Sequence, residues 1–314
     1  MNSVLTDSVI PAASHGFRSG FIALIGRPNV GKSTLMNQLI GQKVAITSPV
    51  AQTTRNRLRG ILSNDQSQVI FVDTPGIHKP HHQLGKILVK NARASIEGVD
   101  AVLFVVDGSV PMGKGDRFIA DMLAAAKVPI IVGLNKIDQR SPQKQAEIES
   151  TYAQLIQQQP QWRLSQFSAL TQKGLKALQK SLRQVLPAGP YYYPPDLVTD
   201  QPERFIMGEL IREQVLLLTR EEVPHSVAVV VEKVEESPKV TRVLATIHVE
   251  RKSQKGILIG KQGSMLKSIG TAARHQMQKL IDGKVYLELF VKVQPKWRSS
   301  RLKLSELGYQ VETN

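Results

Sequence analysis

The chain has 314 residues, about twice the length of a typical domain, and 41% of them are hydrophobic, enough for a core in each of two domains. It has no cysteine, which excludes disulfides, thiolate metal sites and cysteine nucleophiles, and Met1 to Gly16 shows no basic start followed by a long apolar run. The net charge of +15 favours nucleic acid as partner first and an anionic membrane surface second. We therefore expect a soluble, cytoplasmic protein.

The basic charge is unevenly distributed along the chain. Residues 1–187 carry 22 basic and 11 acidic side chains, and residues 188–250 carry 6 basic and 11 acidic ones. Residues 251–301 carry 12 basic and only 2 acidic ones. Because this last stretch has the densest positive charge, we expect RNA contacts there.

Short apolar runs alternate with helix-length segments in the first half of the chain. Their spacing predicts buried strands of an open, mostly parallel sheet with helices between them, which is the α/β class. A helix predicted over Gly174–Leu186 ends before Pro187, and residues 188–202 then hold four prolines. The predicted strands are Phe21–Ile25, Val69–Val72, Ala101–Val106 and Ile130–Leu134.

A separate, smaller α+β domain is predicted after these prolines. The pattern favours a helix over Phe205–Thr219, paired strands at Ser226–Glu232 and Val243–Glu250, a helix over Gly263–Ile281 and a strand at Val285–Val293. We therefore expect a flexible N-terminal extension (1–17), a first domain (18–187), a linker (188–203), a second domain (204–301) and a C-terminal tail (302–314).

A phosphate-loop pattern follows the first predicted strand and opens a helix: Gly26-Arg27-Pro28-Asn29-Val30-Gly31-Lys32-Ser33, continued by Thr34. The glycines let backbone N–H groups surround the phosphates, and the helix N-terminus adds positive potential. In this pattern Lys32 reaches the β- and γ-phosphates and Ser33 ligates Mg²⁺. We therefore predict a nucleotide site here, with Lys32 as a catalytic residue.

Two further motifs follow predicted strands and complete the nucleotide site. Asp73-Thr74-Pro75-Gly76 offers a carboxylate for Mg²⁺ and a glycine N–H that senses the γ-phosphate, so Gly76 is counted as catalytic. In Asn135-Lys136-Ile137-Asp138, the Asp138 carboxylate accepts two hydrogen bonds that guanine offers and adenine does not. Ser168-Ala169-Leu170 would supply a backbone N–H to guanine O6. The motifs together predict a GTPase using GTP or GDP and Mg²⁺.

The segment Gln52-Thr53-Thr54-Arg55 lies in a stretch with weak hydrophobic periodicity, and we interpret it as switch I. A threonine in this segment completes the Mg²⁺ shell when the γ-phosphate is present. Thr54 is the first choice for this ligand and Thr53 the second. The predicted metal ligands are therefore Ser33, Thr54 and Asp73, and Thr54 is also counted as catalytic.

Two residues bear on how the attacking water is activated. Ile77 stands where many GTPases carry a glutamine that orients the water, so we expect slow intrinsic hydrolysis. Asn29 could offer its side-chain carbonyl to K⁺ beside the phosphates as a catalytic aid, or could simply make a hydrogen bond within the loop. We interpret His78, His81 and His82 as switch II loop residues rather than a metal site.

A GxxG loop, Gly260-Lys261-Gln262-Gly263, lies inside the basic stretch, with helix, strand and strand predicted before it and helix and strand after it. This order predicts a type II KH fold that binds single-stranded RNA. The apolar face of the next helix, including Leu280, is interpreted as core. The candidate phosphate contacts are Lys252, Lys255 and Lys267, with Arg251, Arg274, Lys296, Arg298 and Arg301 as further candidates.

The set of motifs, with Ile77-His78 after Gly76 and one C-terminal KH domain, resembles the Era family of GTPases, whose GTPase domain is of the TrmE–Era type. Thr199 to Arg204, Glu209 to Glu213 and Glu222 to His225 are similar to that family's linker and first KH helix. The resemblance implies a monomer that binds the 3′ end of 16S rRNA in the small-subunit precursor, assists its maturation, leaves after hydrolysis, and contacts the inner membrane peripherally.

Two alternatives remain from the sequence. One is a GTPase of another class, such as a tRNA-modification or iron-transport GTPase, which the C-terminal domain disfavours. The other is an RNA-binding assembly factor that uses GTP mainly as a structural ligand, with little hydrolysis unless a partner activates it. Ile77 keeps this second alternative open.

Overall fold

The computed structural model describes residues 10–50, 53–77, 96–281 and 283–309, and the statements below refer to these residues. They form two compact units. The described part of the first unit is residues 10–44, 57–77 and 96–200, and that of the second is 45–50, 53–56, 201–281 and 283–309. Among these residues, no helix combines the length and apolar character needed to cross a membrane.

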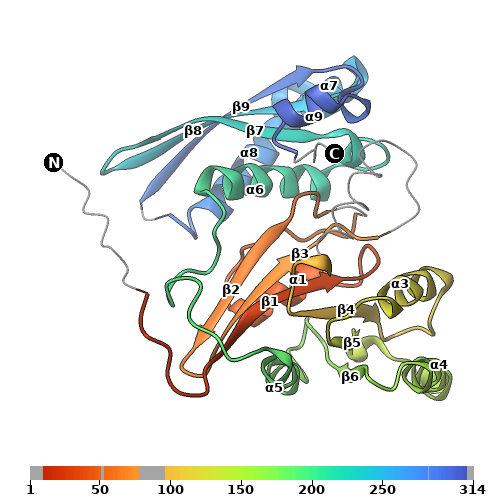
Figure 1. Ribbon diagram of the computed structural model, residues 1–314. Coiled ribbons are helices and arrows are strands. Elements are labelled where there is room, and N and C mark those ends of the chain that lie inside the picture. Colours follow the sequence, from red (N-terminus) through yellow and green to blue (C-terminus); the bar gives the residue numbers. More distant parts are fainter. Residues whose placement is uncertain (1–9, 51–52, 78–95, 282, 310–314) are drawn as a thin grey trace. The chain divides into compact units, whose positions relative to one another are not determined.

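The first unit is built on a six-stranded sheet in the order β2-β3-β1-β4-β5-β6 (Figure 1). Only β2 runs antiparallel to its neighbour, so the predicted α/β class with a mostly parallel sheet is confirmed. The strands are β1 (Arg18–Ile25), β2 (Leu58–Asn64), β3 (Ser67–Asp73), β4 (Ala101–Asp107), β5 (Ile130–Asn135) and β6 (Arg163–Gln166). The sequence did not predict β2 and β6, because neither is a continuous apolar run.

Helices pack against this sheet through alternating strand residues. Ala23 and Ile25 of β1 belong to a core that includes α3 and α4 side chains, while Ile22 and Leu24, also buried, point the other way. On that side α1 packs against β2 and β3, and α5 against β3 and β6. The helices are α1 (Lys32–Ile40), α3 (Lys114–Ala124), α4 (Gln145–Gln158) and α5 (Leu175–Val185).

Parallel strands bring their carboxyl ends to one edge of the sheet. Asp73 ends β3 and Asn135 ends β5, and the phosphate loop follows β1. The register pairs Leu24 with Asp73 and Asp107 with Asn135, so these strands end at nearly the same level. The sheet therefore gathers side chains that lie more than 100 residues apart in the sequence.

The second unit has a three-stranded sheet in the order β7-β8-β9, with β7 and β8 antiparallel and β8 and β9 parallel (Figure 1). The chain order α6-β7-β8-α7-α8-β9 is the predicted type II KH order with α7 added, a short helix that the sequence did not separate from the GxxG loop. The elements are α6 (Glu203–Leu218), β7 (Ala228–Glu236), β8 (Val240–Val249), α7 (Lys252–Ile259), α8 (Ser264–Met277), β9 (Lys284–Val293) and α9 (Arg301–Glu306).

The segment expected to be a C-terminal tail is folded as far as it is described. Ser300 accepts a hydrogen bond from the amide of Lys303 at the start of α9. Leu304, Leu307 and Tyr309 are buried in a small cluster with Trp297. Spacing of three residues puts the two leucines on one helical face, which explains why this end packs instead of remaining a tail.

Residues 45–50 and 53–56 belong to the second unit, although they lie between two segments of the first in the sequence. Ile46 is part of the second unit's main core, and the amide of Thr47 donates to Glu213 of α6. Arg55 is 3% exposed. Its guanidinium donates to the carbonyls of Pro224, His225 and Val227 and to the Tyr309 hydroxyl, and it lies 6.0 Å from the ring centroid of Trp297.

We expect Arg55→Lys to lower the free energy of unfolding of the second unit by about 2 kcal/mol or more, because an ammonium group cannot reach all four acceptors, and buried unsatisfied acceptors are costly. The chain has two tryptophans, Trp162 in the first unit and Trp297 in the second. Denaturant unfolding followed by Trp297 fluorescence in a Trp162→Phe background isolates the second unit. Exposed Arg220→Lys is the control, and equal unfolding midpoints for the two variants would contradict the expectation.

Candidate nucleotide site and RNA-binding loop

The phosphate loop is closely packed at its two glycines. A Cβ on Gly26 would lie 2.2 Å from the carbonyl oxygen of Val105, and one on Gly31 would lie 2.4 Å from Asn135 Nδ2. Gly31 also has φ of 95°, a left-handed conformation that glycine adopts without strain. Any larger residue at these positions would push the loop away from β4 and β5, so both glycines are fixed by the structure as well as by the motif.

Lys32 lies at the first position of α1 and is buried. Its Nζ donates to the carbonyls of Gly26 at 3.1 Å and Arg27 at 2.9 Å. Burial lowers the pKa of Lys32 to about 8, while the Asp73 carboxylate acts in the opposite direction. The Lys32 ammonium is therefore buried at a cost in free energy, and a bound anion would offset that cost.

Ser33 and Asp73 lie together in the first unit. The Ser33 hydroxyl donates to Asp73 Oδ2 at 2.6 Å, and Asp73 is fully buried. Thr74 donates its hydroxyl to the Leu24 carbonyl at 2.8 Å and fixes the turn after β3. A hydroxyl and a carboxylate are the hard oxygen ligands that Mg²⁺ prefers, so this pair fits the predicted metal. Thr54, the third predicted ligand, belongs to the second unit.

Asn135 connects three loops of the nucleotide site. Its Nδ2 donates to the Val30 carbonyl of the phosphate loop at 2.8 Å. Its Oδ1 accepts from the amides of Lys136 at 2.8 Å and Ala169 at 2.9 Å. Because the side chain is 2% exposed, these bonds form in a region of low dielectric. The first residue of the Asn135–Asp138 motif therefore joins the phosphate loop to the backbone at Lys136 and Ala169.

An ion pair holds Lys136, the second residue of the Asn135–Asp138 motif. Lys136 has φ of 63° and its Nζ forms an ion pair with Asp107 at 2.8 Å. Hydrogen bonds from Lys136 and Ser109 outweigh the effect of burial and hold the pKa of Asp107 below its ordinary value. Asp138 is exposed. Nothing in the sequence singled out Asp107, which ends β4 just as Asp73 ends β3.

Arg27 is a second residue whose role the motif does not reveal. Its Nε lies 2.7 Å from Oδ1 of Asp116 on α3, and Asp116 is fully buried. The other carboxylate oxygen of Asp116 accepts from the amide of Gly113 at 3.2 Å. This pair ties a variable position of the phosphate loop to α3, and only the structure brings the two residues together.

Gly76 and Ile77 continue the turn after β3. The Ile77 amide donates to the Gly26 carbonyl at 3.1 Å, and a Cβ on Gly76 would lie 2.6 Å from the backbone nitrogen of Pro28. The Ile77 side chain is 2% exposed and packs in the core with Ala23 and Phe104. An aliphatic group buried in this way is unable to orient a water molecule.

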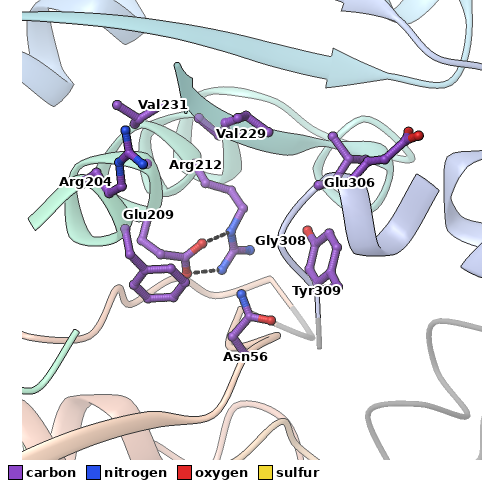
Figure 2. A pocket seen from close by; sticks show the side chains of 13 residues that line it. Asn56, Arg204, Glu209, Arg212, Val229, Val231, Glu306, Gly308 and Tyr309 are labelled. Atoms are coloured by element: carbon purple, nitrogen blue, oxygen red, sulfur yellow. Dashed lines mark hydrogen bonds and ion pairs between the residues drawn. The ribbon is translucent and has the colours of Figure 1, made fainter. Parts of the chain in front are cut away.

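Thr53, in the segment predicted to be switch I, is bonded to α6 within the second unit. Arg212, 1% exposed, donates to the carbonyl of Thr53 and pairs with Glu209 at 2.8 and 2.6 Å. Figure 2 shows this pair at the centre of a pocket of about 250 Å³ that Asn56 and Tyr309 also line. Thr54 therefore lies between two anchored neighbours, the Thr53 carbonyl and the Arg55 side chain.

Asn29 has φ of 63°, the left-handed conformation that asparagine tolerates better than most residues. Gln52, His78, His81 and His82 lie outside the described residues. Among the residues that are described, no group of three or more His, Asp or Glu side chains is arranged to hold a metal ion.

The GxxG loop joins α7 to α8. A Cβ on Gly260 would lie 2.8 Å from the backbone nitrogen of Met265, so only glycine fits there, whereas Gly263 faces open space and is selected by its φ of 78°. Lys261 and Gln262 are exposed, and Gln262 has φ of 51°. The loop thus presents polar side chains on a backbone that can be approached closely.

The predicted basic contacts divide into two groups. Lys252 and Lys267 are exposed and Lys255 is half-buried, all near the GxxG loop in sequence. Arg298 instead pairs with Glu250 and donates to the His225 carbonyl, which makes it a structural residue. Leu280, expected in the core, is 45% exposed because α8 ends at Met277.

We expect Asn135→Ala to weaken GDP binding by about tenfold or more, a cost of about 1.4 kcal/mol, since it removes three hydrogen bonds that order the loops. Binding is measured by titration with a fluorescent GDP analogue. Exposed Gln139→Ala, four residues further on, is the matched control. Equal affinity in both variants would show that Asn135 does not organise the site.

Comparisons with known proteins agree with this geometry. A model of the 50S ribosome-binding GTPase family matches residues 21–136, and a KH domain model matches residues 222–298. GTPase Era of Nostoc sp. is 69% identical over 312 residues, 99% of this chain and 96% of that protein, and GTPase Era of Synechocystis sp. is 63% identical over 311 residues, 99% and 98%. A crystal structure of Era with MgGDPNP and nucleotides 1506–1542 of 16S ribosomal RNA matches with a TM-score of 0.90 at 37% identity, covering 94% of this chain and 100% of that one. The chain therefore belongs to the GTPase Era family.

Proposed function

We propose that this chain is a GTP-hydrolysing switch that binds the 3′ end of 16S rRNA through its KH domain and assists maturation of the small (30S) ribosomal subunit. The observation that carries the proposal is the joint presence, in one chain, of a phosphate loop ordered by Asn135 and an exposed GxxG loop. Support for the RNA element comes from the related Era, whose structure contains nucleotides 1506–1542 of 16S ribosomal RNA.

In this proposal each nucleotide motif has one task. Lys32 neutralises the β- and γ-phosphates, Ser33 and Asp73 hold Mg²⁺, and Thr54 joins them when GTP is bound. The metal, when bound, supplies positive charge at the phosphates. The Gly76 amide responds to the γ-phosphate. Asp138 selects guanine, and a backbone amide of the Ser168–Leu170 loop donates to guanine O6. The Ser168 amide donates to the Lys173 carbonyl and the Ala169 amide donates to Asn135, so we propose the Leu170 amide for this contact.

The proposed hydrolysis is slow in the isolated protein. Ile77 is buried and lacks the polar group that would orient water. Asn29 is the proposed ligand of a K⁺ ion that would place positive charge where other GTPases insert an arginine. The K⁺ proposal depends on this one residue of the phosphate loop.

We expect single-turnover hydrolysis by the isolated protein to remain below several per second and to be faster in K⁺ than in Na⁺ at matched ionic strength. Asn29→Ala should remove the difference in hydrolysis rate between the two salts, because the side-chain carbonyl that binds K⁺ is lost. Unchanged GDP affinity of this variant would show that its phosphate loop is intact. Equal rates in both salts for the unaltered chain would exclude the K⁺ role. A rate above several per second without any partner would contradict slow water activation.

Exposed Lys261 and Gln262 allow a direct test of RNA binding. We expect Lys261→Asp with Gln262→Asp to weaken binding of an RNA fragment containing nucleotides 1506–1542 of 16S rRNA by about tenfold or more, since acidic side chains repel the phosphates. Gln278→Asp with Lys279→Asp, an adjacent exposed pair just after α8, has the same change in charge and is the control. Equal weakening in both variants would remove the GxxG loop from the proposal.

The ribosomal target and the alternative are tested with the same protein. Crosslinking the GTP-bound chain to RNA in cell lysate should recover mainly small-subunit rRNA, and recovery mainly of other RNA would withdraw the ribosome assignment. Bound RNA should raise the rate of hydrolysis. No increase would favour the alternative in which GTP is mainly a structural ligand.

The location and assembly state belong to the proposal as well. We propose a monomer that works in the cytoplasm on the small-subunit precursor. The net charge of +15 and the resemblance to the Era family support a further proposal, peripheral contact with the inner membrane.

A further inference from the structure

The first unit carries positive charge that neither the nucleotide site nor the KH domain uses. Between Glu149 and Asp196 the sequence has no acidic residue, and it has five basic ones, Arg163, Lys173, Lys176, Lys180 and Arg183. Three of these lie on α5 at positions i, i+4 and i+7, which places them along one face of the helix. A helix with three cations and no carboxylate has no internal ion pairs to neutralise it.

These three cations line a groove of about 270 Å³ between α5 and strands β2 and β3. Lys176 and Lys180 are exposed. Arg183 is held at the groove by donating to Gln66 in the turn between β2 and β3. No acidic side chain is among the described residues that line the groove; Asp65, in the same turn, is not one of them. The groove is therefore positively charged on one wall without a carboxylate opposite.

The opposite wall adds neutral hydrogen-bond donors. Asn64 Oδ1 accepts from the amides of Gln66 and Ser67 and from the Ser67 hydroxyl, at 2.9, 2.9 and 3.2 Å. With its oxygen fixed in this way, the Asn64 amide nitrogen keeps its two N–H donors for a ligand. Cations on one side and a fixed amide donor on the other suit a chain of phosphates and ribose hydroxyls.

The groove is separate from the nucleotide site. It lies where β2 ends and β3 begins, at Asn64 and Ser67, whereas the nucleotide motifs follow the last residue of β3, Asp73. These are opposite ends of the same strand. A ligand in the groove would leave the phosphate loop accessible.

We propose that this groove, formed by Lys176, Lys180, Arg183 and Asn64, is a second RNA contact that binds backbone phosphates regardless of base sequence. The proposal rests on the proposed function, because it assumes that the chain works on RNA. It adds that the GTPase domain itself holds the RNA backbone. Contacts of this kind position an RNA and raise affinity, while base-specific contacts elsewhere supply the specificity.

The test compares the salt dependence of RNA binding by the full chain. We expect Lys176→Gln with Lys180→Gln to reduce the slope of log Kobs against log salt by about 1.4, since each phosphate contact to a single strand contributes about 0.7. The reduction should be the same for poly(U) and for the fragment with nucleotides 1506–1542 of 16S rRNA. Lys127→Gln with Lys144→Gln, exposed lysines of the same unit outside the groove, gives the same loss of charge and should leave the slope unchanged.

Three results would overturn the proposal. An unchanged slope in the groove variant would show that the lysines do not contact RNA. Equal reductions in both lysine pairs would show only diffuse attraction. Loss of binding to phosphatidylglycerol vesicles, with the RNA slope unchanged, would reassign the groove to a membrane surface. The GxxG variant separates this test from that of the proposed function, because its RNA defect is expected whatever the groove does.

Discussion

The buried guanidinium of Arg55 holds its part of the segment predicted to be switch I to the second unit. A fully desolvated cation is stable only where acceptors surround it, and here three backbone carbonyls and the Tyr309 hydroxyl do so. Burial lowers the pKa of Arg55, yet arginine stays charged in proteins, so the cost of burial must be met by these bonds. Residues 53–56 are therefore held to the KH unit by these bonds, although they precede it by about 150 residues in the sequence.

This attachment has a thermodynamic consequence for the proposed switch. Thr54 stands between Thr53, whose carbonyl accepts from Arg212, and Arg55. If GTP recruits Thr54 as proposed, the nucleotide acts on a segment whose neighbours are bonded within the KH unit. Under that proposal, nucleotide binding and ligand binding to the KH unit would change each other's affinity by the same factor. No separate signalling element is required.

The sequence predicted the parts of the site that follow from strand order. Asp73 and Asn135 were identified because each ends an apolar run, and a parallel sheet gathers such ends. Other residues of the site lie in no sequence pattern that predicts their contacts. Arg27 occupies a variable position of its motif, and its partner Asp116 is about 90 residues away. A single arginine beside two threonines gives no sign of burial, so the sequence predicts only a switch residue at Arg55. Two leucines are too few to establish a helical period, so the sequence predicts a tail where α9 forms.

The groove on α5 would alter how tightly such a protein holds RNA. Two contacts joined in one chain turn the second binding step into an intramolecular one, so that two weak sites act together when the RNA can reach both. The GxxG loop then needs only moderate affinity for its bases, and rapid release follows once either contact is lost. Two weak contacts therefore suit reversible RNA binding better than a single tight one, because the loss of either contact lowers the affinity of the whole chain for RNA.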